Sequence, residues 1–165
     1  MKAIVAVDKN WGIGKNNDLL FSIPEDMKFF RETTKGKVVV MGANTLRSFP
    51  GGNPLKNRVN IVLSTTILRD DCMVVDSLDK LFNQIKKYPT DEVYLIGGAK
   101  LYKTLLPYCT EALVTKVDAD GKATKFFENL DLLDEWTLLN KSEKKISNGF
   151  EMVFTTYKNN NVKQI

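Results

Sequence analysis

One carboxylate, Asp26, stands where a protein could use it for proton transfer or for binding a cationic ring. It lies in the first turns of a predicted helix, with Met27 and Phe30 on the same face. Apolar neighbours desolvate a carboxylate and raise its pKa, which suits it to these roles. The helix dipole also favours an acidic residue at this position, so the pattern alone leaves a purely structural role open.

Two junctions between an apolar run and a helix could bind phosphate. Gly42 follows the run 37–41, and Gly97-Gly98 follows the run 92–96. A helix that begins just after a buried strand points free N–H groups and the positive end of its dipole at the carboxyl edge of the sheet. Two such ends side by side could hold the two phosphates of a dinucleotide, although glycine after a strand is also common in turns. Neither junction has the GxGxxG pattern of a Rossmann fold.

Missing residue types restrict the chemistry. The 165-residue chain has no histidine, and its two cysteines, Cys72 and Cys109, lie outside any CxxC spacing. This excludes Ser-His and Cys-His hydrolysis and most zinc sites, and we expect no metal. Proton transfer must use a carboxylate, lysine, tyrosine or water. The cysteines are expected to be free thiols in a reducing compartment.

The net charge of +4 comes from lysines scattered along the chain rather than gathered in a run. A solvated surface is the expected role of these lysines, with nucleic-acid binding a weak alternative. A mild positive field also suits an anionic ligand. No apolar stretch reaches the length of a signal-peptide core or a membrane span, so we expect a soluble, cytoplasmic protein.

The elements that would position these residues form an α/β pattern. Apolar runs at 3–7, 37–41, 59–63, 92–96 and 112–115 predict strands covered by helices on both faces. Helices are predicted from an N-cap at Ser22 to about Thr34, from Ser77 over 78–85, and from Gly98 to near Pro107. Extended segments at 136–145 and 150–158, joined through Asn148-Gly149, predict an antiparallel hairpin. The polar tail, 159–165, is expected to fray.

Five groups of residues stand in the order and spacing found in bacterial dihydrofolate reductases, so that nearly the whole chain resembles this family. They are Ile13-Gly14, Pro24-Glu25-Asp26, Met41-Gly42 with Thr45, 57–64, and Ile96-Gly97-Gly98. The resemblance implies a single-domain α/β fold over residues 1–158. Its eight-stranded mixed sheet would be flanked by four helices and end in an antiparallel hairpin, ahead of the C-terminal tail 159–165.

The activity that the resemblance implies is NADPH-dependent reduction of 7,8-dihydrofolate to tetrahydrofolate. Hydride would pass from nicotinamide C4 to pterin C6, and N5 would be protonated. The protein would be a monomer that also binds antifolate-type ligands, with no nucleic acid or membrane among its partners.

The resemblance also implies a folate site. Asp26 would bind the pterin N3 and amino group and favour protonation at N5, with the Thr115 hydroxyl behind it. Arg58 would pair bidentately with the glutamate carboxylate, a role that lysine performs poorly. Ile4 and Ile96 would contact the pterin edge through their carbonyls. The expected catalytic residues are Asp26, Thr115 and Tyr102. The expected substrate-binding residues are Ile4, Val5, Leu19, Phe21, Asp26, Met27, Phe30, Phe49, Leu55, Arg58, Ile96 and Thr115.

An NADPH site is implied in the same way. Ala6 and Ile13 would contact the nicotinamide, and Thr45 with the backbone at 98–100 would hold the pyrophosphate. The Gly97-Gly98 bond is expected to be cis. The expected cofactor-binding residues are Ala6, Ile13, Gly14, Asn17, Leu19, Gly42, Ala43, Asn44, Thr45, Leu63, Ser64, Thr65, Ile96, Gly97, Gly98, Ala99, Lys100, Leu101, Tyr102 and Thr124.

Several positions depart from the family pattern. Phe21 replaces a tryptophan, Ala43 an arginine that reaches the cofactor phosphates, and Ala123 an aspartate that tethers the loop 13–19 in some relatives. Asn44 and Asp76 stand where cationic side chains are common. We therefore expect a reduced preference for NADPH over NADH, by roughly 1–3 kcal/mol if one charged hydrogen bond is lost.

Two other functions fit parts of the pattern. A pyrimidine reductase of riboflavin biosynthesis shares this fold and NADPH, but its ribose phosphate substrate does not need Asp26 and Arg58 together. A folate- or nucleotide-binding protein without turnover is suggested by Phe21, Ala43 and Ala123.

Overall fold

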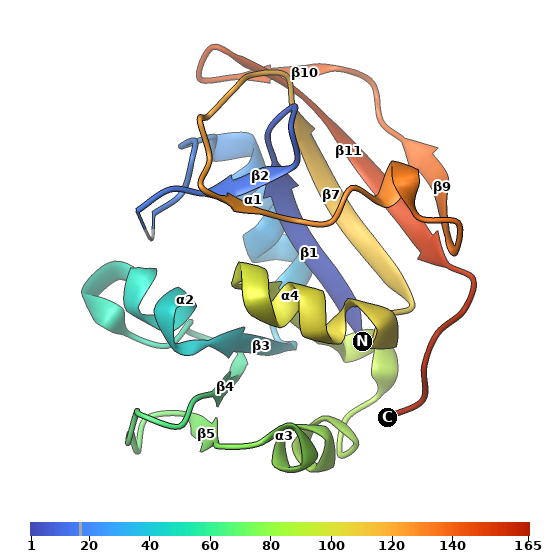
Figure 1. Ribbon diagram of the computed structural model, residues 1–165. Helices are drawn as coiled ribbons and strands as arrows, with labels where there is room; N and C mark the ends of the chain where they lie inside the picture. Colours follow the sequence, from blue (N-terminus) through green and yellow to red (C-terminus); the bar gives the residue numbers. More distant parts are fainter. Residues whose placement is uncertain (17) are drawn as a thin grey trace.

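A mixed β-sheet runs through the molecule, as the computed structural model of residues 1–16 and 18–165 shows (Figure 1). Its strands lie in the order β10-β11-β7-β1-β6-β3-β4-β5. Pairing is parallel from β7 through β1, β6, β3 and β4 to β5, and antiparallel where β11 joins β7. The strands of this path before the hairpin are β1 (Lys2–Val7), β3 (Val38–Gly42), β4 (Val59–Leu63), β5 (Met73–Val75), β6 (Val93–Gly97) and β7 (Glu111–Val117).

The five apolar runs predicted as strands are confirmed as β1, β3, β4, β6 and β7. The short β5 was not predicted, and neither were β2 (Gly12–Gly14) and β8 (Lys125–Phe126), which pair with each other in a separate two-stranded sheet. These segments are too short to show a hydrophobic period, and the glycines of β2 have low strand propensity.

The helices occur where the sequence predicts them. The described α-helices are α1 (Pro24–Thr34), α2 (Ala43–Ser48), α3 (Leu78–Ile85) and α4 (Ala99–Leu105). Short 3₁₀ turns lie at Pro50–Gly52, Thr90–Glu92, Leu106–Tyr108 and Leu130–Leu132. The cap predicted at Ser77 is confirmed, since its Oγ accepts from the Lys80 N–H at 3.2 Å.

The cap predicted for α1 is wrong. Ile23, and not Ser22, occupies the N-cap position, and no side chain of the helix start accepts from its free N–H groups. Instead Ser147 of the distant hairpin accepts from the Glu25 N–H at 3.3 Å. Asn148 of the same turn donates to the Ser22 carbonyl at 2.8 Å. The tertiary contact with Ser147 thus provides the capping hydrogen bond that the local pattern assigned to Ser22.

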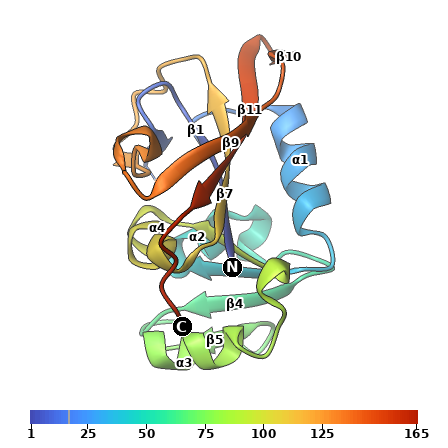
Figure 2. The same cartoon turned by 90° about the vertical axis from the view of Figure 1, so that its right-hand side faces the viewer.

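Alternating side chains of the central strands build a core on each face of the sheet. On β3, Val38 and Val40 belong to the main core, whereas Val39 and Met41 belong to a second cluster on the opposite face. The main core packs against α3 and α4, and the second cluster includes Leu46 of α2. Helix α1 lies across the sheet from α4 (Figure 2). The sheet therefore has helices on both faces, as predicted.

The C-terminal hairpin consists of β9 (Trp136–Lys141), β10 (Lys145–Ser147) and β11 (Phe150–Asn159). Asn148 and Gly149 have φ of 51° and 79°, as a type I′ turn requires. The predicted single strand over 136–145 is interrupted at Ser142, so β9 and β10 pair with different parts of β11. The sheet thus has eight strand positions, one of them filled by two segments.

The predicted tail, 159–165, is polar but not frayed along its whole length, contrary to the prediction, and its first residue ends β11. Asn159 is 4% exposed, and its amide donates to the Cys109 carbonyl at 3.0 Å. Further on, the Lys163 N–H donates to the Pro107 carbonyl at 2.9 Å. Across the residues that the structure describes, no helix combines the length and apolar character needed to cross a membrane.

Candidate active site

One face of α1 carries two expected substrate-binding residues, Asp26 and Phe30, followed by Thr34. Asp26, Phe30 and Thr34 are spaced by four residues, so they lie one above another on the same side of the helix. The first and last are about 12 Å apart along the helix axis, at a rise of about 1.5 Å per residue. Thr34 is fully buried, and its hydroxyl donates to the Phe30 carbonyl at 2.8 Å. The face therefore presents an acid, an aromatic ring and a hydroxyl in that order.

Asp26 has the altered acidity that its surroundings in the sequence predict. Burial raises the pKa of its carboxyl group, and the nearby Thr115 hydroxyl on β7 opposes part of this rise in pKa. Thr115 is 2% exposed and pairs with Ala6 of β1. Strand β7 thus places a hydroxyl behind the carboxylate, and Asp26 holds a proton more readily than a solvated aspartate.

Tyr102 reaches the same region from α4. Its hydroxyl donates to the Ile4 carbonyl of β1 at 2.7 Å. Burial raises the pKa of Tyr102 far above its ordinary value, and Asp26 adds to that rise. The phenol therefore stays protonated, and it holds the middle of β1 at Ile4 rather than exchanging protons.

Arg58 is held at the far end of the α1 face. Its Nε donates to Thr34 Oγ1 at 2.8 Å, its Nη1 to the Lys56 carbonyl at 2.9 Å and its Nη2 to the Arg31 carbonyl at 3.4 Å. The guanidinium carbon lies 5.9 Å from the centre of the Phe30 ring. Burial lowers the pKa of Arg58, and the Arg31 guanidinium adds to this effect.

None of the ion pairs in the described part of the chain includes Arg58. Its positive charge is fixed in place by neutral acceptors and has no carboxylate of this protein as a partner. A pre-oriented guanidinium of this kind suits an incoming carboxylate.

The two glycine junctions lie beside each other at the carboxyl edge of the sheet. Strands β3 and β6 pair there, Met41 opposite Gly97, and α2 and α4 begin directly afterwards. A methyl group on Gly98 would lie 3.6 Å from Thr45 Oγ1, and one on Gly42 would lie 4.0 Å from the Gly98 nitrogen. A methyl group at Gly42 or Gly98 would thus make ordinary contacts with the neighbouring junction, which shows how closely the two junctions approach each other.

Neither α2 nor α4 has a side-chain cap, so their first N–H groups are available. The Thr45 hydroxyl of α2 lies close to the β6–α4 junction, 3.4 Å and 3.6 Å from the positions of a methyl group on Gly97 and Gly98. These donors fit the pyrophosphate of a dinucleotide. The expected cis bond at Gly97-Gly98 is confirmed.

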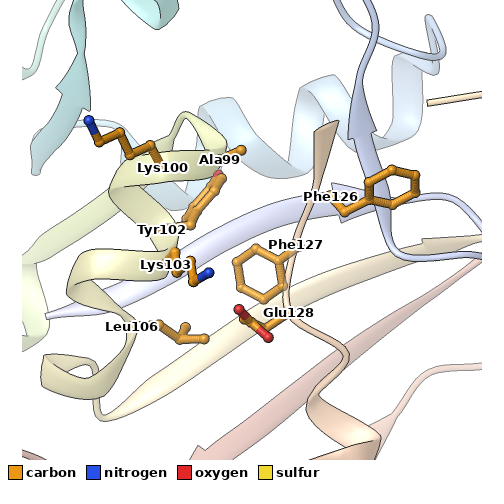
Figure 3. Close-up of a pocket in the computed structure, with 8 residues that line it drawn as sticks. All are labelled: Ala99, Lys100, Tyr102, Lys103, Leu106, Phe126, Phe127 and Glu128. Carbon is orange, nitrogen blue, oxygen red and sulfur yellow. The ribbon is translucent and has the colours of Figure 1, made fainter. Parts of the chain in front are cut away.

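A cavity of about 280 Å³ opens on the outer side of α4, between this helix and the segment that follows β8 (Figure 3). It is lined by Ala99, Lys100, Tyr102, Lys103, Leu106, Phe126, Phe127 and Glu128. Three of the expected cofactor residues, Ala99, Lys100 and Tyr102, therefore border it. Asp26 and Arg58 do not, so the cavity is not the space along the α1 face. No group of three or more possible metal ligands occurs among the described residues.

Comparisons with known proteins agree with this geometry. The family model described as dihydrofolate reductase matches residues 1–159. The chain belongs to the dihydrofolate reductase family. It is 34% identical over 162 residues to a dihydrofolate reductase of Bacillus subtilis (strain 168), covering 96% of this chain and 94% of that protein. The dihydrofolate reductase of Haemophilus influenzae is 35% identical over 136 residues, 82% of each chain. That of Schistosoma mansoni is 37% identical over 185 residues, 95% of each chain.

The apolar residues that this family membership leads us to expect in the folate site differ in how far they are buried. Three of the expected substrate-binding residues, Phe49, Leu55 and Ile96, pack against the same cluster on the α2 side of the sheet. Leu19 is 71% exposed and Met27 is 49% exposed, so both side chains are free to meet a ligand. Val5 is buried in the main core and can offer a ligand little beyond its backbone.

Phe21, the replacement for a family tryptophan, packs on Phe150 of the hairpin, with ring centroids 4.8 Å apart. Its partner ring comes from β11, so the hairpin supports this side of the site. Its position beside the pterin stays a prediction.

The expected cofactor residues form two groups, and the first includes those expected near the nicotinamide. Ala6 and Ile13 lie near the ends of β1 and β2, and the Gly14 carbonyl accepts from the Thr124 N–H at 2.9 Å. Leu101 is 8% exposed within the main core, so only its backbone can face a cofactor. Asn17 lies outside the described residues.

The phosphate rim consists of Ala43, Ser64 and Thr65, the residues expected near the cofactor phosphates outside the glycine junctions. All three side chains are neutral. Leu63, the last residue of β4, pairs with Gly42, which brings the rim residues next to the α2 start. The Ser64 hydroxyl accepts from the Thr66 N–H at 3.1 Å and so caps its own turn.

Asp76 and Asn44, which stand where cationic side chains are common in the family, each have a cationic partner in the structure. Asp76 forms an ion pair with Lys80 at 2.8 Å, which offsets its negative charge. Asn44 accepts from Arg47 Nη1 at 2.8 Å, one turn further along α2. Arg47 was not singled out in the sequence, although its spacing from Asn44 places the two side chains on one helix face.

Thr34 was also missed. The spacing of four from Phe30 and of eight from Asp26 could have placed it on the same face of α1. Its contact with Arg58 spans 24 residues and has no local signal.

Proposed function

We propose that this chain reduces 7,8-dihydrofolate to tetrahydrofolate with NADPH, and that the α1 face binds the substrate along its length. The observation that carries this assignment is the order Asp26, Phe30, Thr34 with Arg58 at the far end. Folate has the same order of chemistry: a pterin ring with polar edges, an aromatic benzoyl group and a glutamate carboxylate. The length of the face, about 12 Å, suits such an extended molecule.

Asp26 is the acid of this site. Its raised pKa allows the carboxyl group to exchange a proton at a pH where an ordinary aspartate is fully ionised. The carboxyl group binds the pterin N3 and amino group and favours protonation of N5, with solvent as the proton source. Thr115 supports Asp26 and Tyr102 supports β1 at Ile4, in keeping with their contacts.

Arg58 binds the glutamate carboxylate. Three acceptors fix its guanidinium before any ligand arrives, so little side-chain entropy is lost on binding. A ribosylated pyrimidine substrate would have no carboxylate for it, which favours folate over the riboflavin-type alternative.

NADPH supplies the hydride when it is bound. The residues that would hold it are Thr45 and the backbone at 42–44 and 98–100, because their donors and open space fit a pyrophosphate. Ala6 and Ile13 would flank the nicotinamide. The contribution of the chain is to align the two ligands and to exclude water between them.

We also propose a monomer in the cytoplasm. Both cysteines, Cys72 and Cys109, are free, as thiols of a reducing compartment would be.

The test is absorbance-monitored oxidation of NADPH with dihydrofolate, for the wild type, Asp26→Asn and the neighbouring control Glu25→Gln. We expect wild-type turnover and a control within about twofold of it. Asp26→Asn should lose turnover at neutral pH by roughly 100-fold or more and regain part of it in acid, where solvent protonates the pterin directly. A wild type that binds folate tightly without turnover would identify a binding protein instead.

A further inference from the structure

Asp8 is a buried carboxylate outside the substrate site, and its side chain joins two segments that border that site. Asp8, the residue after β1, is 2% exposed. Its Oδ1 accepts from the Gly12 N–H at 2.7 Å and from the Asn10 N–H at 2.8 Å, and its Oδ2 accepts from the Gly121 N–H at 3.0 Å. Burying a carboxyl group is costly unless its oxygens are hydrogen-bonded, and here both are.

The donors belong to segments far apart in sequence. Gly12 begins β2, whereas Gly121 precedes β8, and the bond from Gly121 to Asp8 spans 113 residues. Backbone bonds continue this junction, from Thr124 N to the Gly14 carbonyl at 2.9 Å and from Phe127 N to the Trp11 carbonyl at 2.8 Å. The Asp8 side chain thus links the two segments at one end of this run of backbone hydrogen bonds.

Both linked segments touch expected active-site residues. A methyl group on Gly121 would lie 2.9 Å from Leu20 Cδ1 and 3.1 Å from Phe21 Cζ, so this glycine packs directly against the Phe21 side of the folate site. Gly12 is followed at once by Ile13, the expected nicotinamide contact. The position of the Asp8 carboxyl group therefore affects residues expected beside both reacting rings, the pterin and the nicotinamide.

The Ala123 substitution fits into this arrangement. A methyl group on Gly12 would collide with the Ala123 methyl, so the two segments are in close apolar contact at that point. The aspartate that tethers this loop in some relatives is absent here, and Asp8 supplies a carboxylate from the other side.

We propose that Asp8 is a positioning residue for hydride transfer, which holds Phe21 and Ile13 against the two ligands by fixing Gly121 and Gly12. This inference rests on the proposed function. Asp8 touches neither ligand, so its removal should change how well the rings are aligned and not the acid chemistry of Asp26.

The variant Asp8→Asn tests this, because an amide keeps the shape but turns one acceptor into a donor that faces an N–H. The matched control is Asp118→Asn, an exposed aspartate at the end of β7. In single turnovers at saturating NADPH and dihydrofolate, we expect the hydride-transfer rate constant of Asp8→Asn to fall roughly 10- to 100-fold, as misalignment predicts. The apparent pKa of this step should stay at its wild-type value, and the control should remain within about twofold.

Titration of active sites with an antifolate separates alignment from stability. If Asp8→Asn lowers the melting temperature and the active fraction but leaves the rate constant per active site unchanged, Asp8 only stabilises the fold and the inference is wrong. If Asp8→Asn does not fold, Gly121→Ala replaces it, since the added methyl pushes on Leu20 and Phe21 while Asp8 stays. An unchanged rate constant in Gly121→Ala would then refute the inference.

Amide NMR signals give a readout that does not require turnover. Asp8→Asn should shift the signals of Leu20 and Phe21 as well as those of Gly12 and Gly121, and Asp118→Asn should not. Unmoved Leu20 and Phe21 signals would contradict the positioning role. A wild type without dihydrofolate turnover would refute the proposed function, while these signals would still decide whether Asp8 positions Phe21.

Discussion

At the scale of single residues, Asp26 shows how an active-site group opposes stability. Burial raises the pKa of its carboxyl group, so the folded protein keeps a proton that the unfolded chain has already released. The free energy of unfolding therefore falls as the pH rises from the ordinary aspartate pKa, about 3.9, through the higher pKa of the folded state. This cost is therefore larger at neutral pH than in acid.

We expect Asp26→Asn to melt at a higher temperature than the wild type at pH 7, because the buried negative charge is removed. A gain of one kcal/mol would raise the melting temperature of a chain this size by about 2–4 °C. The difference should become smaller in acid, because Asp26 then becomes protonated in the unfolded chain as well as in the folded protein. Differential scanning calorimetry at pH 7 and pH 3.5 measures it.

The control for this prediction is Asp79→Asn, which changes the same charge at an exposed position in the first turn of α3. It should melt slightly lower than the wild type, because the helix dipole favours the carboxylate there. An Asp26→Asn variant that melts no higher than the wild type at pH 7 would contradict the argument.

Sequence reasoning found the site residues that carry a local signal and missed those that act across the fold. Asp26 was singled out as a candidate by its apolar neighbours, and its role, like that of Arg58, was assigned from the family motifs. Thr34 and Asp8 were not, because their decisive bonds, to Arg58 and to Gly121, join positions 24 and 113 residues apart. Such contacts are properties of the folded chain and leave no periodic pattern.

At the scale of elements, the starts of α2 and α4 depend on backbone that a side chain would disturb. Gly97 has φ of +122°, a region that L-residues rarely enter. A methyl group there would also lie 3.2 Å from Tyr102 Cε2 and 3.4 Å from Thr45 Oγ1. The junction between β6 and α4 must therefore shift if this glycine is replaced.

We expect Gly97→Ala to weaken NADPH binding by roughly tenfold or more, since a backbone strain of about 1–3 kcal/mol is relieved by moving the cofactor-binding N–H groups. A fluorescence titration with NADPH measures the Kd. The control is Gly149→Ala, which has φ of +79° but no atom within 4 Å of the new methyl. It should lose stability without changing the Kd. Equal Kd values for the wild type and Gly97→Ala would count against the proposed cofactor site.

The bounds of α1 were predicted correctly, and its cap was not. Pro24 is a local start signal and Gly36 a local stop signal, and both can be read directly from the sequence. The residue that accepts from the helix start, Ser147, comes from a hairpin 122 residues away. Elements were thus predictable from propensity and period, whereas their junctions were decided by packing.

At the scale of the whole molecule, the net charge of +4 suits two anionic ligands, but the charge is not concentrated at the phosphate rim. Ala43 brings no charge, and Asp76 is occupied by Lys80. Arg47, held by Asn44, is a cation on the α2 side of the rim. The prediction of a reduced NADPH preference therefore stands on Ala43.

We expect Ala43→Arg to raise the ratio of kcat/KM for NADPH over NADH by roughly tenfold or more, the value of one charged hydrogen bond. The KM for NADH should change little, and added salt should reduce the gain in the ratio. Asn140→Arg on the exposed edge strand β9 adds the same charge away from the rim and serves as the control. A large wild-type ratio that Ala43→Arg leaves unaltered would show that other residues already read the 2′-phosphate.

The order of strands in the sheet has a consequence for how the chain is made. Strand β1 lies between β6 and β7, so the first strand of the chain gains its two neighbours only after residue 117 has been synthesised. At about 5–20 residues per second, β1 waits roughly 5–20 s on the ribosome before its partners emerge. Its edge toward β7 is unpaired throughout that time, so we expect the nascent chain to be a substrate for chaperones and to fold slowly compared with proteins of mainly local contacts.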